Sequence, residues 1–193
     1  MRKGLGIAMV LFFYAGVTRI VAQDMPKFEV SGGYSYVRGN QITSSGCCFG
    51  MSGGLGSVAF NLGRSVGIVG EFGGYHSGNV NNTGLDLNVF TYVFGPRVSY
   101  RGGGHLVPFG EVLIGGGHAS GGLYSGTSTS ASYGSQNGFA LTTGGGLDVK
   151  LATYLALRLI QADYLLTRFK NGTNDHQNNL RLSAGIVLRF GRK

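Results

Sequence analysis

Four charged side chains of both signs stand out in the middle of the chain: Glu71, Arg97, Glu111 and Arg158. They lie on segments that we expect to be neighbouring or nearby strands, at a similar distance from the turns. Carboxylates and guanidiniums placed in this way form ion pairs, because an unpaired charge in a narrow interior would cost several kcal/mol. We therefore predict a structural network of buried ion pairs, and keep a gated conductance through this network as the functional alternative.

A second candidate is the pair His118 and Ser120, whose His-x-Ser spacing allows an imidazole to activate a serine nucleophile. Certain outer-membrane lipid A deacylases carry this arrangement. Here the match is three residues at the start of a Gly/Ser-rich segment, where chance supplies it easily. We therefore expect no enzyme and no catalytic residues, with a lipid-modifying activity as the lesser alternative. His76, His105 and His176 are too scattered to predict a metal site, and no cofactor is expected.

The chain has two cysteines, Cys47 and Cys48, and they are adjacent. If the chain is exported, as its first residues indicate (below), these cysteines will tend to be oxidised. Adjacent cysteines close only a strained ring, and strained disulfides are easily reduced. Two thiolates alone lack the further ligands that zinc prefers. The sequence therefore leaves two possibilities open, a vicinal disulfide or two free thiols.

The first residues have the build of a secretory signal peptide. Arg2 and Lys3 are basic, residues 4–17 are apolar, and the small residue Ala22 precedes Gln23. The apolar run is shorter than the ~20 residues of a membrane-spanning helix. We predict a signal peptide at residues 1–22 and one domain at residues 23–193, with an uncleaved anchor as the alternative.

The composition indicates a protein whose outer surface does not face water. Glycine accounts for 37 of 193 residues and charged residues for only 12%, against about 25% in soluble domains. No apolar run after residue 22 is long enough for a membrane helix, so a membrane-spanning form must be a closed β-barrel with every backbone group paired. The net charge of +8 is scattered along the chain, and we expect no nucleic-acid partner.

Period-two alternation predicts eight strands. It is clearest at residues 180–190, and it recurs at 28–36, 58–62, 66–72 and 139–150. Two further strands are expected within 85–100 and 105–117. Residues 154–169 are mostly apolar at first and fit a strand with a β-bulge that re-aims Gln161 or Asp163. The last strand is far longer than the 5–6 residues usual in soluble sheets and matches the ~9–11 of a membrane barrel.

The expected connections alternate in length. Short turns fall at residues 62–65, 101–104 and 151–153, and long polar loops at 40–50, 77–84, 119–137 and 170–178. Short periplasmic turns and long outer loops are typical of outer-membrane barrels, and an even strand number puts both termini in the periplasm. A soluble lipocalin-like barrel is the alternative, but it would bury its apolar face. Strand length, the leader and the low charge favour a polar lumen.

Five segments, taken in order and spacing, resemble the small outer-membrane β-barrel proteins related to OmpX and to the transmembrane domain of OmpA. They are residues 94–101 (FGPRVSYR), 107–116 (VPFGEVLIGG), 144–151 (GGGLDVKL), 155–169 (LALRLIQADYLLTRF) and 178–191 (NNLRLSAGIVLRFG). The resemblance implies an eight-stranded antiparallel up-and-down transmembrane β-barrel. It also implies a monomer in the bacterial outer membrane, with its lipids and its insertion machinery as partners.

Two features depart from that family. Its members usually end on an aromatic residue, whereas Phe190 is followed by Gly191, Arg192 and Lys193. The chain has no tryptophan, so an aromatic girdle must come from its 10 Tyr and 12 Phe. No peptidoglycan-binding domain follows the barrel, so that function is not carried over.

An eight-stranded barrel is just wide enough to be filled by side chains. We therefore predict a non-enzymatic integral outer-membrane protein with a filled lumen and a structural or surface-interaction role. A narrow passive channel is the first alternative.

Overall fold

The computed structural model describes residues 25–39, 49–78, 86–102, 104–123, 132–169 and 176–192. The predicted signal peptide, the pair Cys47 and Cys48, and most of the predicted long loops lie outside the described residues. None of the described residues forms a helix long and apolar enough to cross a membrane.

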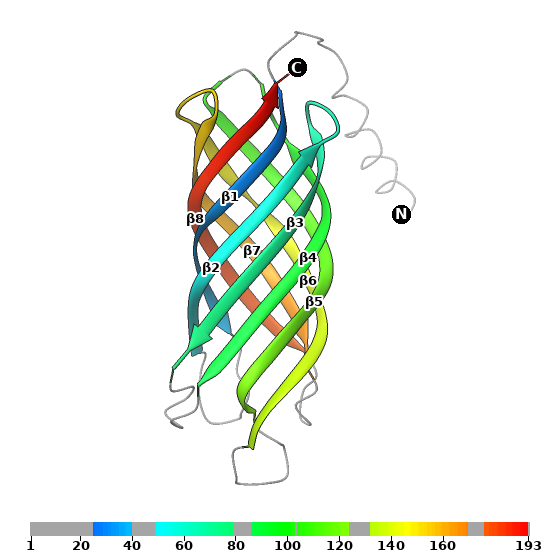
Figure 1. Cartoon of the computed structure of the whole chain (residues 1–193), viewed down its shortest axis with the longest axis vertical. Helices are drawn as coiled ribbons and strands as arrows, with labels where there is room; N and C mark the ends of the chain where they lie inside the picture. Colours follow the sequence, from blue (N-terminus) through cyan, green and yellow to red (C-terminus); the bar gives the residue numbers. More distant parts are fainter. Residues whose placement is uncertain are drawn as a thin grey trace, which may run out of the picture.

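Eight antiparallel strands close into one barrel, in which each strand pairs with its neighbours in sequence and β1 pairs with β8 (Figure 1). The strands are β1 (Pro26–Gly39), β2 (Phe49–Asn61), β3 (Val66–Ser77), β4 (Leu87–Ser99), β5 (Leu106–Leu123), β6 (Ser132–Lys150), β7 (Leu155–Arg168) and β8 (Gln177–Arg192). The eight-stranded antiparallel up-and-down barrel expected from the sequence is confirmed.

The two ends of the barrel differ. The start of β1, the end of β8 and the three short connections lie at one end, which we call the turn end and which is uppermost in Figure 1. The strands β1, β3, β5 and β7 end at the opposite end of the barrel, which we call the loop end. Backbone hydrogen bonds join two connections at the turn end to the ends of strands: Ser99 N of β4 donates to Ser65 O (2.7 Å), and Lys150 N of β6 donates to His105 O (2.8 Å).

Alternation divides the strands between an apolar outer face and an inner face that carries the buried charged side chains. Phe72, Phe94 and Tyr100 on the outer face are 66%, 62% and 69% exposed. On the inner face Glu71 and Arg97 are almost completely buried. A soluble lipocalin-like barrel has the reverse arrangement, so that alternative does not describe this chain.

A β-bulge in β7 sets the phase of that strand. Leu159 and Ile160 are consecutive and both face outward, and together they oppose one residue of β8 between the pairs Arg158–Gly185 and Gln161–Ser183. The extra residue shifts the alternation by one. Gln161 and Asp163 therefore point into the lumen instead of into the outer face, as the sequence predicted for such a bulge.

The hairpin of β5 and β6 corrects one expectation. A loop was predicted at residues 119–137, but β5 continues to Leu123 and β6 begins at Ser132. Backbone pairing extends through this Gly- and Ser-rich stretch, because ladder hydrogen bonds do not need the apolar alternation by which the strands were recognised. His118 and Ser120 thus lie within β5, not after it.

Candidate functional site: the charged lumen

The lumen holds ten buried charged side chains among the described residues, and the two signs are equal in number. The five acids are Glu29, Glu71, Glu111, Asp148 and Asp163, and the five bases are Arg97, Arg101, Arg158, Arg181 and Arg189. Burial of so many charges is tolerated only where each one is paired or hydrogen-bonded. The equal numbers make the buried set formally neutral as a whole.

Gln161 is the centre of the network. Its Nε2 lies 2.9 Å from Glu111 Oε1, 2.9 Å from Asp163 Oδ2 and 3.2 Å from Glu71 Oε2. Its Oε1 accepts a hydrogen bond from Arg158 Nη1 at 2.8 Å. Three carboxylates on the amide nitrogen and one guanidinium on the amide oxygen define which way the amide points. A neutral side chain thus joins acids from β3, β5 and β7.

Two ion pairs flank an aromatic ring on β5. Arg97 Nε donates to Glu111 Oε2 at 2.7 Å, and Arg158 contacts both carboxylate oxygens of Asp148, at 2.8 and 3.2 Å. The two guanidinium carbons lie 4.5 Å (Arg97) and 4.4 Å (Arg158) from the centroid of the Phe109 ring. Phe109 therefore makes two cation–π contacts, one with the arginine of each ion pair.

Arg181 of β8 closes the network towards the loop end. Its Nη2 lies 2.7 Å from Glu71 Oε1 and 2.7 Å from Asp163 Oδ2, and its side chain is completely buried. Its Nη1 donates to Tyr75 Oη at 3.1 Å. One guanidinium thereby links β3, β7 and β8 across the lumen.

The four residues singled out from the sequence all belong to this network, but only Arg97 and Glu111 pair with each other directly. Glu71 pairs with Arg181, and Arg158 with Asp148. Gln161 connects the four through hydrogen bonds. Sequence reasoning did not assign Gln161 this role, because an amide carries no charge; its signal was its position in an otherwise apolar segment.

A second ion-pair group lies at the turn end of the lumen. Glu29 Oε1 accepts from Arg101 Nη2 at 3.2 Å and lies 3.5 Å from Arg189 Nε. Arg101 Nη2 also donates to Asn61 Oδ1 at 3.1 Å. Arg101 was expected in a turn, and its backbone does follow β4, but its side chain reaches back into the barrel.

Towards the loop end, the lumen contains a cluster of buried hydrophobic side chains. Its buried side chains come from six strands and the residue after β7: Val37, Met51, Tyr75, Leu87, Val89, Ala119, Leu165 and Phe169. The charged network and this cluster occupy successive levels of the lumen. An open water-filled path is not expected through such an interior.

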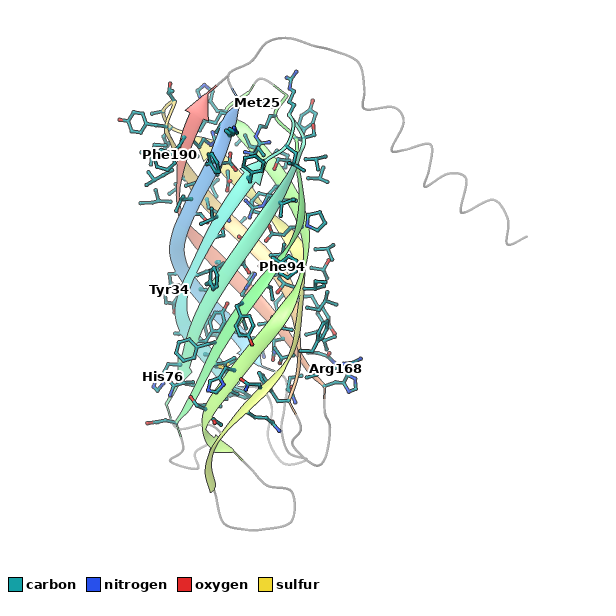
Figure 2. The ribbon with its side chains drawn as sticks, turned by 45° about the vertical axis from the view of Figure 1, so that its right-hand side comes forward. Met25, Tyr34, His76, Phe94, Arg168 and Phe190 are labelled. Carbon is teal, nitrogen blue, oxygen red and sulfur yellow. The ribbon has the colours of Figure 1, made fainter. Side chains whose placement is uncertain are left out.

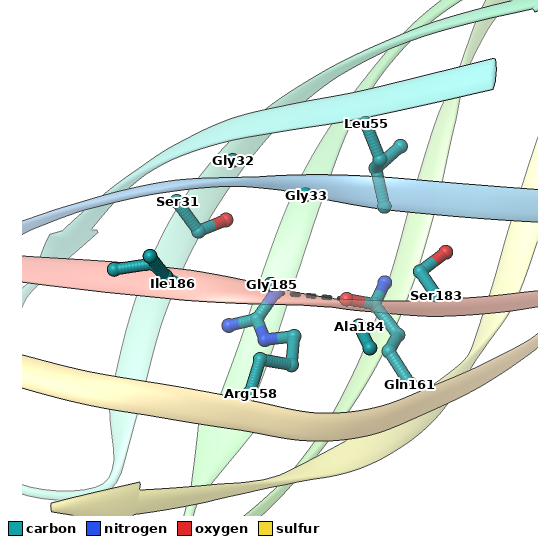
Figure 3. A pocket seen from close by; sticks show the side chains of 10 residues that line it. All are labelled: Ser31, Gly32, Gly33, Leu55, Arg158, Gln161, Ser183, Ala184, Gly185 and Ile186. Carbon is teal, nitrogen blue, oxygen red and sulfur yellow. Dashed lines mark hydrogen bonds between the residues drawn. The ribbon is translucent and has the colours of Figure 1, made fainter.

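A small cavity lies between the network and the β1–β8 seam (Figure 3). Arg158 and Gln161 line it on one side, and Ser31, Leu55 and Ser183 on the other. It has room for about one water molecule. Cofactor and substrate pockets are larger by more than an order of magnitude, so this cavity is part of the packing of the lumen.

The pair His118 and Ser120 lies on β5 outside the lumen. His118 Nδ1 lies 2.7 Å from Asn137 Oδ1 on β6, so the imidazole is hydrogen-bonded to an amide across the hairpin. A matching bond joins His76 Nδ1 and Asn88 Oδ1 (2.9 Å) on β3 and β4. These two His–Asn pairs occupy equivalent positions near the loop end, where Figure 2 shows His76. Their repetition on two hairpins favours a structural role.

Two solved structures with the same architecture are bacterial surface proteins. The chain has the fold of small outer-membrane barrels. It matches the attachment invasion locus protein Ail of Yersinia pestis with a TM-score of 0.61 and 16% identity over 86% of this chain and 99% of that one. It matches the Neisserial surface protein NspA with a TM-score of 0.58 and 15% identity over 85% and 97%. No protein-family model matches the chain, and no curated protein matches it in sequence.

Proposed function

We propose that this protein is an integral, non-enzymatic barrel of the bacterial outer membrane, monomeric and with a lumen sealed by its own side chains. The observation that carries this proposal is that the two faces are reversed relative to a soluble barrel. Large apolar side chains lie on the outside, and ten charged side chains are buried inside. A membrane solvates the first face, and mutual pairing neutralises the second. Outer-membrane lipids and the insertion machinery are the partners that this placement requires.

The height of the apolar face supports the membrane placement. The outward positions of β3 run from Val66 to His76, and those of β5 run from Leu106 to His118. With ~3.3 Å per residue and a tilt of about 40°, these stretches span roughly 25–30 Å along the barrel axis. The apolar band of outer-membrane barrels is about 25 Å tall. The two His–Asn pairs would then lie at the membrane boundary on the loop side.

We infer that the turn end faces the periplasm and the loop end the cell surface. Short turns on the side of the termini and longer loops opposite are the arrangement of bacterial outer-membrane barrels. The role we propose is therefore structural, with surface contact through the loops. The related fold of Ail, a protein named for attachment and invasion, is in keeping with a surface role.

Membrane fractionation tests the placement. The expressed protein should enter the outer-membrane fraction and migrate on a denaturing gel at different positions before and after boiling, because a closed barrel resists detergent until heated. Recovery in the soluble periplasmic fraction, without heat-dependent mobility, would overturn the proposal.

Planar-bilayer recording tests the sealed lumen. We expect no steady single-channel current from the reconstituted protein, because charged and apolar layers both fill the interior. A steady current that changes in Arg97→Gln or Glu111→Gln variants would contradict the sealed lumen and favour the narrow passive channel.

Surface labelling tests the orientation. In a background with both native cysteines replaced by serine, a cysteine is introduced by Asp86→Cys at the loop end or by Gly63→Cys at the turn end. A membrane-impermeant maleimide added to intact cells should label the first variant and not the second. The reverse pattern would invert the proposed orientation.

A further inference from the structure

Positive charge gathers at the turn end of the lumen. Arg101 and Arg189 are buried there, Lys150 is half-buried at the end of β6, and Arg64 is half-buried in the connection between β2 and β3. The carboxylate in contact with these groups is that of Glu29. The buried set is neutral as a whole, but its charges are unevenly distributed along the axis.

Asp148, the second acid whose charge acts on Arg189, does not compensate this excess. Asp148 is held by Arg158 through two hydrogen bonds of 2.8 and 3.2 Å, so its charge is already matched. The charges of Glu29 and Asp148 both act on Arg189, but those of Arg101 and Arg158 oppose them. One carboxylate, Glu29, therefore serves two guanidiniums.

Arg189 is the group left incompletely satisfied. Its side chain is only 5% exposed, and its Nε lies 3.5 Å from Glu29 Oε1, at the limit of a hydrogen bond. Among the described residues, its Nη2 has no hydrogen-bond partner, and neither does the Nε of Arg101. A buried charged donor without an acceptor is costly. Arg189 and Arg101 therefore both offer unused hydrogen-bond donors at the turn end of the lumen.

Lys150 is the more accessible cation beside Arg189 and Arg101. It follows Asp148 by two residues on β6 and so shares its inward face. The charges of Arg189, Arg101 and Arg64 act together on its ammonium group. Because Lys150 is only half-buried, an anion arriving at the mouth from the turn end meets it first.

The frame around these donors is fixed by the protein itself. Arg64 Nη2 donates to Arg101 O at 2.9 Å, and Arg101 Nη1 donates back to Arg64 O at 2.8 Å. Asn61 Nδ2 donates to Pro26 O at 2.9 Å, which ties in the start of β1. Arg101 and Arg64 are thus held in position without a ligand, which lowers the entropic cost of binding one.

We propose that the turn-end mouth of the lumen is a binding site for a phosphate-class oxyanion, with Arg189 and Lys150 as its contacts and Arg101 behind them. A guanidinium presents paired donors that match phosphate oxygens, and an ammonium adds a point charge. Free phosphate and the phosphodiester of a lipid headgroup share this chemistry. The proposal rests on the geometry of the mouth and not on which side of the membrane the turn end faces.

Titration of the refolded protein in an amine-oxide detergent, which contains no phosphate, tests the site. Inorganic phosphate is added at constant ionic strength, and binding is followed through the arginine Nε–H signals in nitrogen–proton NMR spectra. We expect a saturable shift, weakened about tenfold or more by Arg189→Gln and weakened by Lys150→Gln. Glu29→Gln should tighten binding, since it removes the competing carboxylate. Arg168→Gln, an exposed arginine at the loop end, is the matched control and should change nothing.

A second experiment uses a short-chain phosphatidylglycerol in the same micelles. It distinguishes free phosphate from the phosphodiester of a lipid headgroup as the ligand. A response to free phosphate assigns the site to a soluble anion, and a response to the lipid alone assigns it to a headgroup. If neither probe gives a saturable shift, or if Arg168→Gln weakens binding as much as Arg189→Gln, the proposal is wrong. Should Arg189→Gln lose heat-dependent mobility, Arg189→Lys and Lys150→Gln carry the same comparison.

Discussion

Arg158 and Gln161 are separated by two outward-facing residues, yet their side chains meet inside the lumen, with Arg158 Nη1 donating to Gln161 Oε1 at 2.8 Å. In a regular strand, residues three apart face opposite sides. The bulge at Leu159 and Ile160 removes this conflict. A local irregularity of the backbone therefore places the amide on which the charged network converges.

Replacement of that amide should destabilise the barrel. Gln161→Leu keeps a similar volume, but it removes the donor shared by Glu71, Glu111 and Asp163 and the acceptor of Arg158. We expect a loss of roughly 3 kcal/mol in the free energy of unfolding, because buried charges lose partners. Urea unfolding in lipid vesicles measures the change.

Gln136→Leu is the matched control for this substitution. Gln136 lies on β6 near the loop end and is only half-buried. Its replacement should leave the unfolding midpoint nearly unchanged. Equal midpoints for Gln161→Leu and Gln136→Leu would show that the hydrogen bonds of Gln161 contribute nothing measurable.

The bulge itself leads to a prediction about deletions in β7. Removal of Leu159 leaves one residue opposite Ala184 and keeps Arg158 and Gln161 on the inner face, so the barrel should still assemble, with reduced stability. Removal of Ala162 instead puts Gln161 and Asp163 in consecutive positions and forces one of them outward. We expect this second deletion to abolish heat-dependent mobility on gels. If both variants assemble to the same extent, the barrel does not require Gln161 and Asp163 to face the lumen together.

The sequence predicted the strands well where one face is apolar. Phe28, Val30 and Tyr34 alternate with Glu29 and Ser35, and the structure exposes the first set and buries the second. The bulge was predictable for the same reason, since the polar residues Gln161 and Asp163 fall at the alternate positions that leucines occupy just before them, which only a shift of phase can turn inward. Alternation failed in the hairpin of β5 and β6, where glycine and serine leave no contrast between the faces.

Pairing within the lumen was not predictable in the same way. Glu71 and Arg181 lie in contact although 110 positions separate them in the sequence. Which strand levels meet inside depends on the tilt and stagger of the closed barrel, and a single sequence does not encode these as a local pattern. The pairing of Arg101 was equally unpredictable. Arg101 lies beyond the end of β4, yet its side chain reaches Glu29 inside the barrel.

Closure of the barrel depends on two facing glycines. Gly33 of β1 and Gly185 of β8 are paired across the seam, and a Cβ atom on Gly185 would lie 2.3 Å from Gly32 O and 2.7 Å from Gly33 Cα. Both contacts are with backbone, which cannot easily shift. Gly185→Ala should therefore cost about 1–3 kcal/mol of unfolding free energy.

Gly32→Ala is the control for the seam, because it lies beside Gly33 on β1 and a Cβ atom there meets nothing within 4 Å. Its unfolding midpoint should match that of the parent or exceed it, since alanine restricts the unfolded chain. Equal losses in both variants would mean that glycine flexibility, not space at the seam, matters.

The depth of the outer face in the membrane can be measured with arginine substitutions on β5. Val112 lies midway between Leu106 and His118 on the outward face and is 49% exposed. In the proposed placement it sits near the bilayer midplane, where arginine costs about 2–4 kcal/mol, whereas His118 lies at the boundary, where the cost falls to about 0–1 kcal/mol. Val112→Arg should therefore be clearly less stable in vesicles than His118→Arg. The same two variants in detergent micelles should differ less, because micelles deform around a charge. Equal stability in vesicles would shift the apolar band away from the level that the two His–Asn pairs indicate.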